Sequence, residues 1–95
     1  MPSVKIGKWW HKEREIDIVA LDENKKKMVF VECKWKDLTY NKSLKILEEL
    51  KEKATFVKWL NDNRLEQYGI IARKLEDKDK LKRKGFLAYD LKDWK

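Results

Sequence analysis

The chain has little cysteine, proline or glycine: one, one and three among 95 residues. A single cysteine excludes an internal disulfide and any metal site built from several cysteines. No apolar run approaches the ~20 residues that a membrane-spanning helix requires, and no signal peptide opens the sequence. These absences predict an intracellular, cytoplasmic protein without a membrane partner, organised as one small domain over residues 1–95.

Charged residues are abundant, and basic residues outnumber acidic ones. Lys and Arg number 24 against 17 Asp and Glu, which gives a formal net charge of +7. Such an excess favours a polyanionic partner, because bound lysines and arginines release counterions from phosphates. A surface rich in both Lys and Glu is equally typical of proteins from hyperthermophiles. Charge alone therefore leaves the function open.

The pattern of apolar residues predicts a mixed α/β fold. Residues 4–10, 15–21 and 28–36 are expected to form strands, which polar turns join into an antiparallel meander. Residues 68–72 and 86–91 predict two further strands, separated by a polar, partly helical stretch. The helix between the third and fourth strands is long enough for a crossover, so these two strands are expected to be parallel. The expected fold is an α/β sandwich with a mixed sheet.

The crossover segment has the periodicity of an amphipathic helix. We expect Asn41 or Ser43 to cap its start and residues 61–63 to close it. Apolar residues recur at spacings of three and four, which predicts a helical face made of Leu44, Leu47, Leu50, Ala54, Val57 and Leu60.

The third predicted strand, MVFVECKWK, contains two charges where an apolar run would be buried. Glu32 and Lys34 interrupt it, and burying a charge without a partner costs several kcal/mol. A symmetrical hairpin between the second and third strands pairs Leu21 with Met28. The same register matters for the two charges, because directly opposed side chains on a sheet interact.

This register brings carboxylates together. It places Asp17 opposite Glu32 and Glu15 opposite Lys34. Two facing carboxylates destabilise a sheet unless a cation lies between them, and Mg²⁺ is commonly held by one or two carboxylates and water. Lys34 would then contact a phosphate oxygen or the attacking water, a set suited to phosphodiester hydrolysis. The alternative is that Glu32 and Lys34 lie on the solvent face of a half-exposed strand.

These residues also match a known family pattern. Asp17 in EIDIVAL, followed by Glu32-Cys33-Lys34 in VFVECKW, resembles the signature of the PD-(D/E)xK nuclease superfamily, here without its proline. That superfamily includes archaeal Holliday-junction resolvases and many restriction endonucleases. The longer run GKWWHKEREIDIVALDENKKKMVFVECKW, with YGIIARK and GFLAYDL, is similar to the nuclease-like C-terminal domain of a family of archaeal AAA-type ATPases. The resemblance covers almost the whole chain and implies a restriction-endonuclease-like core.

The resemblance also implies an activity. Asp17 and Glu32 would bind Mg²⁺ or Mn²⁺, the main-chain carbonyl of Cys33 would complete the metal site, and Lys34 would position or activate the attacking water. Glu15 has no fixed role in the family, and we expect it to partner Lys34. The implied function is a metal-dependent DNA endonuclease, with branched DNA among its candidate substrates. The alternative is a catalytically inactive module that binds nucleic acid or docks on an ATPase.

Two features depart from the family pattern. The usual first helix with its further acid is missing, since only residues 1–8 precede Trp9-Trp10. None of the three glycines fits a Walker A motif. The chain is therefore expected to be a remnant or an isolated C-terminal domain. A missing helix would leave one face of the sheet uncovered, which predicts a homodimer.

Several other side chains allow a structural and a functional interpretation. For His11 we favour a place in an exposed turn over a phosphate contact. For the tryptophans at positions 9, 10 and 35 we favour packing in the core or at an interface over base stacking. Cys33 favours a small buried side chain over a redox thiol. A DNA path and a plain solvated surface are equally good interpretations of five basic residues: Arg73, Lys74, Lys82, Arg83 and Lys84.

Overall fold

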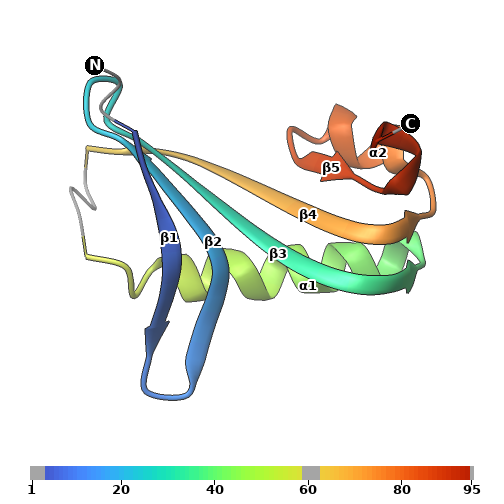
Figure 1. Ribbon diagram of the computed structural model, residues 1–95, viewed down its shortest axis with the longest axis horizontal. Coiled ribbons are helices and arrows are strands. Elements are labelled where there is room, and N and C mark those ends of the chain that lie inside the picture. The colour runs from blue at the N-terminus through green and yellow to red at the C-terminus, as the bar shows by residue number, and fades with distance from the viewer. Residues whose placement is uncertain (1–3, 59–62, 95) are drawn as a thin grey trace.

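Strands that pair in chain order form a mixed sheet, with helices packed against it (Figure 1). The computed structural model describes residues 4–58 and 63–94, and the side chains of Val4 and His11 lie outside the described part. In chain order the elements are β1 (Val4–His11), β2 (Arg14–Asp22), β3 (Lys27–Leu38), α1 (Tyr40–Ala54), β4 (Leu65–Leu75), α2 (Lys78–Arg83), β5 (Leu87–Tyr89) and the 3-10 helix η1 (Leu91–Trp94).

The sheet has the predicted mixture of strand directions. Its order is β1-β2-β3-β4-β5, with the first two pairings antiparallel and the last two parallel. Leu21 pairs with Met28, so the predicted register of the β2–β3 hairpin is confirmed at its turn. Helix α1 makes the crossover between parallel β3 and β4. The α/β class with a restriction-endonuclease-like arrangement is thereby confirmed, and no helix precedes β1 among the described residues.

The ends of α1 differ from the prediction. Thr39, and neither Asn41 nor Ser43, is the N-cap: its hydroxyl oxygen accepts a hydrogen bond from the Lys42 amide at 3.2 Å. The helix ends at Ala54, well before residues 61–63, of which 61 and 62, like Leu60, lie outside the described residues.

A long-range contact explains the early end of α1. The guanidinium of Arg64 donates to the main-chain oxygens of Ala54 at 2.8 Å and Val57 at 2.6 Å. A cation at this position satisfies carbonyls that have no partner within the helix and interacts favourably with its dipole. The residue that terminates α1 thus comes from beyond the connecting segment, just before β4.

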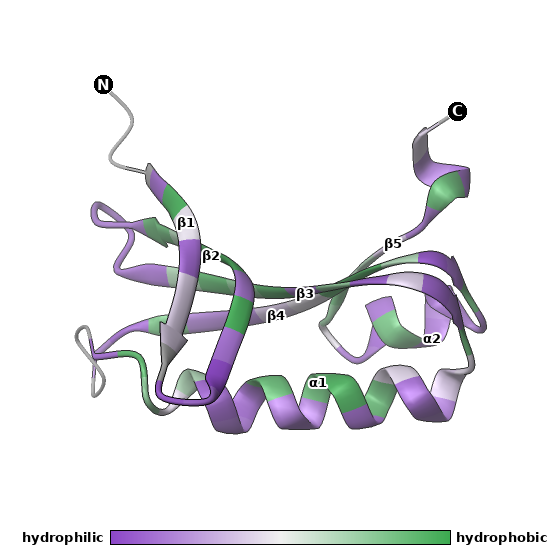
Figure 2. Ribbon diagram, turned by 60° about the horizontal axis from the view of Figure 1, so that its bottom comes forward, coloured by the Kyte–Doolittle hydropathy of each residue, from purple (hydrophilic) through white to green (hydrophobic). Residues whose placement is uncertain are grey.

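One face of the sheet is buried beneath the helices. Phe30 and Ile70 of the sheet and Leu47 and Leu50 of α1 are completely buried in one cluster. Full burial of each such side chain contributes about 1.5–3 kcal/mol. Figure 2 shows α1 and α2 on the same side of the sheet. Within residues 4–58 and 63–94, no helix has the length and apolar character needed to span a bilayer.

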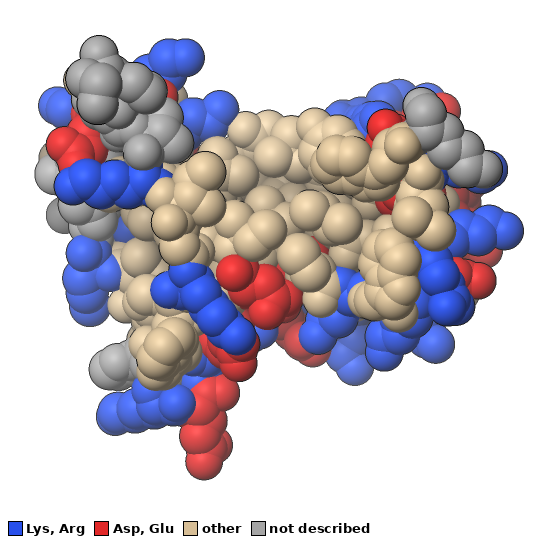
Figure 3. All heavy atoms as spheres, in the orientation of Figure 1, with Lys and Arg blue, Asp and Glu red and all other residues tan. Residues whose placement is uncertain are grey.

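The opposite side of the sheet, which we call the open sheet face, is uncovered by either helix. Uncharged side chains extend across its middle, with Lys, Arg, Asp and Glu gathered towards its ends (Figure 3). By the strand register, this face carries Ile6, Ile18, Ala20, Val29, Val31, Ile71 and Leu87. Ile6 is 73% exposed, so the expectation of an uncovered face is met.

The tryptophans do not share one environment. Trp9 is partly buried against the core cluster. We expected packing in the core or at an interface for all three; Trp10 and Trp35 are each 67% exposed, so they do not pack in the core, and interface packing stays a prediction for them. Trp10 lies near the end of an edge strand, where no further strand covers it among the described residues.

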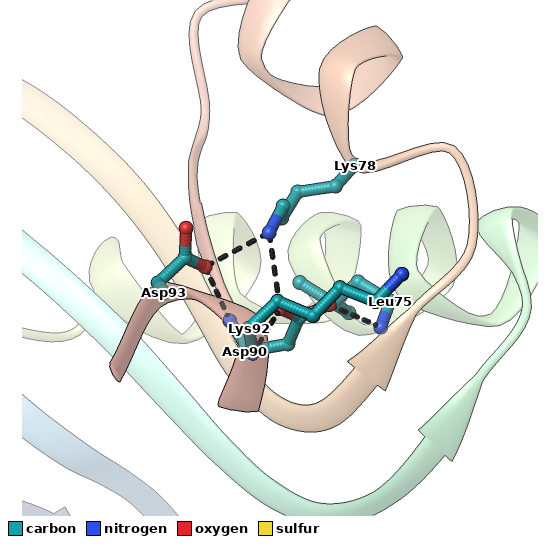
Figure 4. A network of polar contacts seen from close by, with 5 residues as sticks. All are labelled: Leu75, Lys78, Asp90, Lys92 and Asp93. Atoms are coloured by element: carbon teal, nitrogen blue, oxygen red, sulfur yellow. Dashed lines mark hydrogen bonds and ion pairs between the residues drawn. The ribbon is translucent and has the colours of Figure 1, made fainter. Parts of the chain in front are cut away.

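A network of polar contacts, which we call the C-terminal cluster, joins the end of the chain to β4 and α2 (Figure 4). Asp90 is only 2% exposed, and its carboxylate accepts hydrogen bonds from the Leu75 and Lys92 amides and from the Lys78 ammonium. Asp93 accepts from the same Lys78 at 2.9 Å and from the Asp90 amide at 2.8 Å. Burial alone would raise the pKa of Asp90, but these donors hold it below its usual value.

Candidate active site

Asp17 lies at an irregularity in β2. Between the pairs Gly7–Val19 and Trp9–Ile16, β2 advances three residues while β1 advances two, which is a β-bulge. Such a bulge reverses the alternation of side chains beyond it. Ile16 is therefore completely buried in the core cluster, whereas strict alternation along β2 would have placed it on the face of Ile18. Bulges often re-aim a side chain next to an active site.

Where the regular backbone pairing of β2 with β3 ends, the carboxylate of Asp17 forms the next contact between the two strands. The last regular pair between β2 and β3 is Ile18 with Val31. Beyond it, Oδ2 of Asp17 accepts a hydrogen bond from the Cys33 amide at 2.9 Å. Asp17 thus lies beside the Glu32-Cys33 segment, as the hairpin register predicted.

Glu32 is a buried charge with a partner on the helix. It is 4% exposed, and its Oε1 accepts a hydrogen bond from the ammonium of Lys53, in the last turn of α1, at 3.3 Å. Burial raises the pKa of Glu32, the charge of Asp17 raises it further, and Lys53 opposes both. Sequence reasoning missed Lys53. A buried strand glutamate requires a cation, and the helix that covers the strand was the place to look for one.

Lys34 follows Glu32 by one pleat step and lies on the same face of β3. It is half-buried and pairs through its backbone with Ala72 of β4. No ion pair engages its ammonium among the residues that the structure describes. The alternative of a fully solvated strand face does not fit Glu32, whose side chain is buried under α1.

Glu15 has a different partner from the one predicted. It forms an ion pair with Lys8 of β1, and this contact raises the pKa of Lys8. The regular β2–β3 ladder has ended before it reaches Glu15, so it does not stand opposite Lys34 as expected. The physical reason is the bulge, which turns Glu15 towards β1.

Cys33 lies on the open sheet face and is exposed, so the expectation of a buried side chain is wrong. Partial desolvation and the neighbouring carboxylates of Asp17 and Glu32 raise the pKa of its thiol. A raised pKa disfavours the thiolate, which is the reactive form. The raised pKa therefore gives no support to a redox role for this thiol.

The donor set suits a hard divalent cation. Asp17 and Glu32 each use one carboxylate oxygen in a hydrogen bond, and the second oxygen of each has no such partner among the described residues. Mg²⁺ is usually held by one or two carboxylates while it keeps several waters. No group of three or more His, Cys, Asp or Glu side chains gathers as a metal site anywhere in the described ranges, and the pair Asp17 and Glu32 is no exception. In their donor chemistry, these two carboxylates are ligands of the kind that a hard divalent cation prefers.

The four basic residues predicted to bind DNA do not line the hollow that Glu32 and Lys34 border. Arg73 of β4 is engaged by Asp37 at 2.8 Å. Lys74 is the next residue, while Arg83 and Lys84 lie at the end of α2. Arg83 borders a hollow that it shares with carboxylates, including that of Asp90. Arg73 and Lys74 follow Ala72, the backbone partner of Lys34, so they lie in the neighbouring strand without lining the hollow.

Glu32 should impose a pH dependence on stability that Glu32→Gln removes. Because its pKa is raised above the ordinary value of 4.5, the folded state keeps the proton to a higher pH than the unfolded chain does. Its contribution is therefore fully present below the unfolded pKa and is lost as the pH rises through the folded pKa. Urea unfolding across this window should show the loss for the native chain and not for the variant. Glu48→Gln, an exposed change on α1, is the control, and an unchanged pH profile in Glu32→Gln would contradict the assignment.

Comparison with known proteins gives family and fold similarities. Residues 1–46 match a family, DUF234, described as "Archaea bacterial proteins of unknown function". The uncharacterized protein MJECL04 of Methanocaldococcus jannaschii is 41% identical over 91 residues, which are 96% of this chain and 20% of that protein. The chain therefore spans about a fifth of the length of this curated relative.

Solved structures resemble the chain over most of its length. A repair endonuclease from Pyrococcus abyssi aligns with a TM-score of 0.54 at 13% identity, covering 90% of this chain and 37% of that one. A complex of EndoMS with double-stranded DNA aligns with a TM-score of 0.48 at 15% identity, covering 88% and 35%. At such low identity the first of these likenesses shows the fold alone. The chain has a nuclease-like α/β fold with a restriction-endonuclease-like core.

Proposed function

We propose that the protein is a metal-dependent deoxyribonuclease of the PD-(D/E)xK type, which hydrolyses phosphodiester bonds in DNA. The observation that carries this proposal is the placement of the Asp17 carboxylate beside Glu32, with Lys34 on the same face of β3. The net charge of +7 supports a polyanionic substrate.

Each side chain has a distinct role in this proposal. Asp17 and Glu32 hold Mg²⁺ or Mn²⁺, together with the main-chain carbonyl of Cys33. The bound ion polarises the phosphodiester and lowers the pKa of its water. Lys34 stabilises the negative charge that develops on the phosphate oxygens and orients the attacking water. Lys53 opposes the rise in the pKa of Glu32 and so favours the ionised form that binds a cation.

The direct test is cleavage of supercoiled plasmid, linear duplex, single strand and four-way junction with Mg²⁺, with Mn²⁺ and with EDTA. We expect cleavage only when a divalent ion is present, and the four substrates rank the preference for branched DNA. Crystals soaked in Mn²⁺ should show an anomalous peak between Asp17 and Glu32. An absence of cleavage on all four substrates with both metals, or of the peak, would count against the enzyme.

An inactive binding module on the same fold is the second candidate. It is favoured by the contact between Lys53 and Glu32, which already neutralises the buried carboxylate without a metal. In that case DNA binding, or docking on an AAA-type ATPase, survives Asp17→Asn and Glu32→Gln, and no substrate is cut.

A homodimer is part of the proposal. Copies of a chain with a net charge of +7 repel one another except where they present uncharged surface, and the open sheet face provides it. If a second copy covers Val29 and Val31, the protein should sediment as a dimer at micromolar concentration. Val29→Glu would then yield monomers, whereas a monomeric native chain would refute the dimer.

A further inference from the structure

A groove lies between β3 and α1, directly beside the two catalytic candidates Glu32 and Lys34, both of which line it. Its volume is about 290 Å³. Lysines come from both walls: Lys36 with Lys34 from β3, and Lys42 and Lys45 from α1. We call this hollow the β3–α1 groove.

The lysines of the groove are not neutralised. Lys34, Lys36, Lys42 and Lys45 make no ion pair with any described residue. Ion pairs in the described ranges engage seven other cations of the chain, among them Lys78 in the C-terminal cluster. Glu49 also lines the groove, and it forms no ion pair with a described residue. Five lining lysines against two lining glutamates give the groove a net positive charge, which attracts an external anion.

The spacing of these residues makes two facing rows. Residues 42, 45, 49 and 53 recur at intervals of three and four, which places them along one stripe of α1. The stripe extends over about 16 Å at 1.5 Å per residue. Lys34 and Lys36 of β3 both line the groove, across the shift in β3–β4 register between Lys34 and Asp37. An anionic chain lying between the rows meets ammonium groups on both sides.

The size of the groove and the residues that line it limit which ligands it can accept. A volume of about 290 Å³ is at the lower end of small-molecule sites, which suits a group of nucleotide size. Leu38 and Ile46 also line it and offer apolar contact to a sugar or a base. Backbone phosphates of a nucleic acid, with sugars between them, combine the required charge and apolar surface.

We propose that the β3–α1 groove seats the sugar–phosphate backbone of one DNA strand next to the bond that is cleaved. Lys36, Lys42 and Lys45 contact the flanking phosphates, and the strand continues to Lys34 and the two carboxylates. This placement rests on the proposed function for its choice of DNA as the ligand. It moves the DNA path away from Arg73, Lys74, Arg83 and Lys84, where the sequence alone had suggested it.

Binding of a fluorescein-labelled oligonucleotide, followed by anisotropy in EDTA so that no cleavage occurs, tests the inference. The groove variant carries Lys36→Gln, Lys42→Gln and Lys45→Gln. The matched control carries Lys74→Gln, Arg83→Gln and Lys84→Gln, which also removes three positive charges. We expect the groove variant to bind at least about tenfold more weakly and to lower the slope of log K against log salt by about two to three, one per lost phosphate contact. The control should retain the native slope.

The two proposals fail in distinguishable ways. If the control weakens binding as much as the groove variant, or if the native chain does not bind DNA, the groove assignment is overturned. If cleavage with metal is observed while the groove variant binds normally, the nuclease proposal is supported and the groove assignment is refuted. If binding depends on the groove but no substrate is cut, the groove assignment is supported and the nuclease proposal is refuted. Thermal melts of both variants establish that they are folded.

Discussion

Asp17→Asn, Glu32→Gln and Lys34→Met are each expected to lower kcat/KM for DNA cleavage by about a hundred- to a thousandfold or more. Losses of this size follow when a preorganised charge that stabilises the transition state is removed. The Asp17 and Glu32 variants keep the shape of the side chain while reducing its ability to hold a divalent ion. Lys34→Met keeps the aliphatic stem and removes the ammonium.

Two readouts separate the roles of these residues. Cleavage measured across Mn²⁺ concentrations should show that Asp17→Asn and Glu32→Gln weaken metal binding, whereas Lys34→Met leaves metal binding intact and lowers the rate. Glu13→Gln, an exposed change in the turn before β2, is the control and should cleave like the native chain. Full activity in any of the three variants would remove that residue from the catalytic set.

Asp90→Ala should be the most damaging of the polar substitutions for stability, with a loss of about 1–3 kcal/mol in the free energy of unfolding. The carboxylate is 2% exposed and accepts from the Leu75 amide and the Lys78 ammonium, both at 3.0 Å. Its removal leaves a buried amide without an acceptor and Lys78 with Asp93 as its remaining partner in the cluster. Urea unfolding at neutral pH measures the difference.

The pH profile gives an independent check on the same residue. Because the pKa of Asp90 is lowered from 3.8, its contribution is present above the unfolded pKa and is lost as the pH falls through the folded pKa. The native chain should therefore lose stability in acid more steeply than Asp90→Ala does. Asp79→Ala, an exposed change in the first turn of α2, serves as the control. Equal losses for the two variants would show that the C-terminal cluster contributes little.

Much of the fold could be predicted because it follows from local periodicity. Strands, hairpin register and the crossover helix depend on alternation of period two and on apolar spacings of three and four. Leu21 pairs with Met28, and β3 lies parallel to β4, as these patterns implied. The polar stretch and the last strand were also placed, although β5 is shorter than expected and a 3-10 helix follows it.

The errors come from contacts between residues distant in the sequence. The burial of Ile16 follows from a bulge between β1 and β2, and no feature of β2 alone marks it. The end of α1 depends on Arg64, which reaches back across the connecting segment. Cys33 and Trp35 occupy a sheet face that no described helix covers, so apolar composition did not lead to burial there.

For the candidate site, the sequence alone is enough to select Asp17, Glu32 and Lys34 as candidates, because motif spacing and strand alternation are local properties of the chain. Packing of α1 on β3 adds what no local pattern contains: Lys53 as the partner of Glu32, and the lysines that make the β3–α1 groove. Helix rotation and the approach of two elements determine which charges meet, and both depend on the whole core. The sequence motif thus determines which side chains we propose for the chemistry, whereas the proposed path of the substrate depends on a groove that forms only when α1 packs on β3.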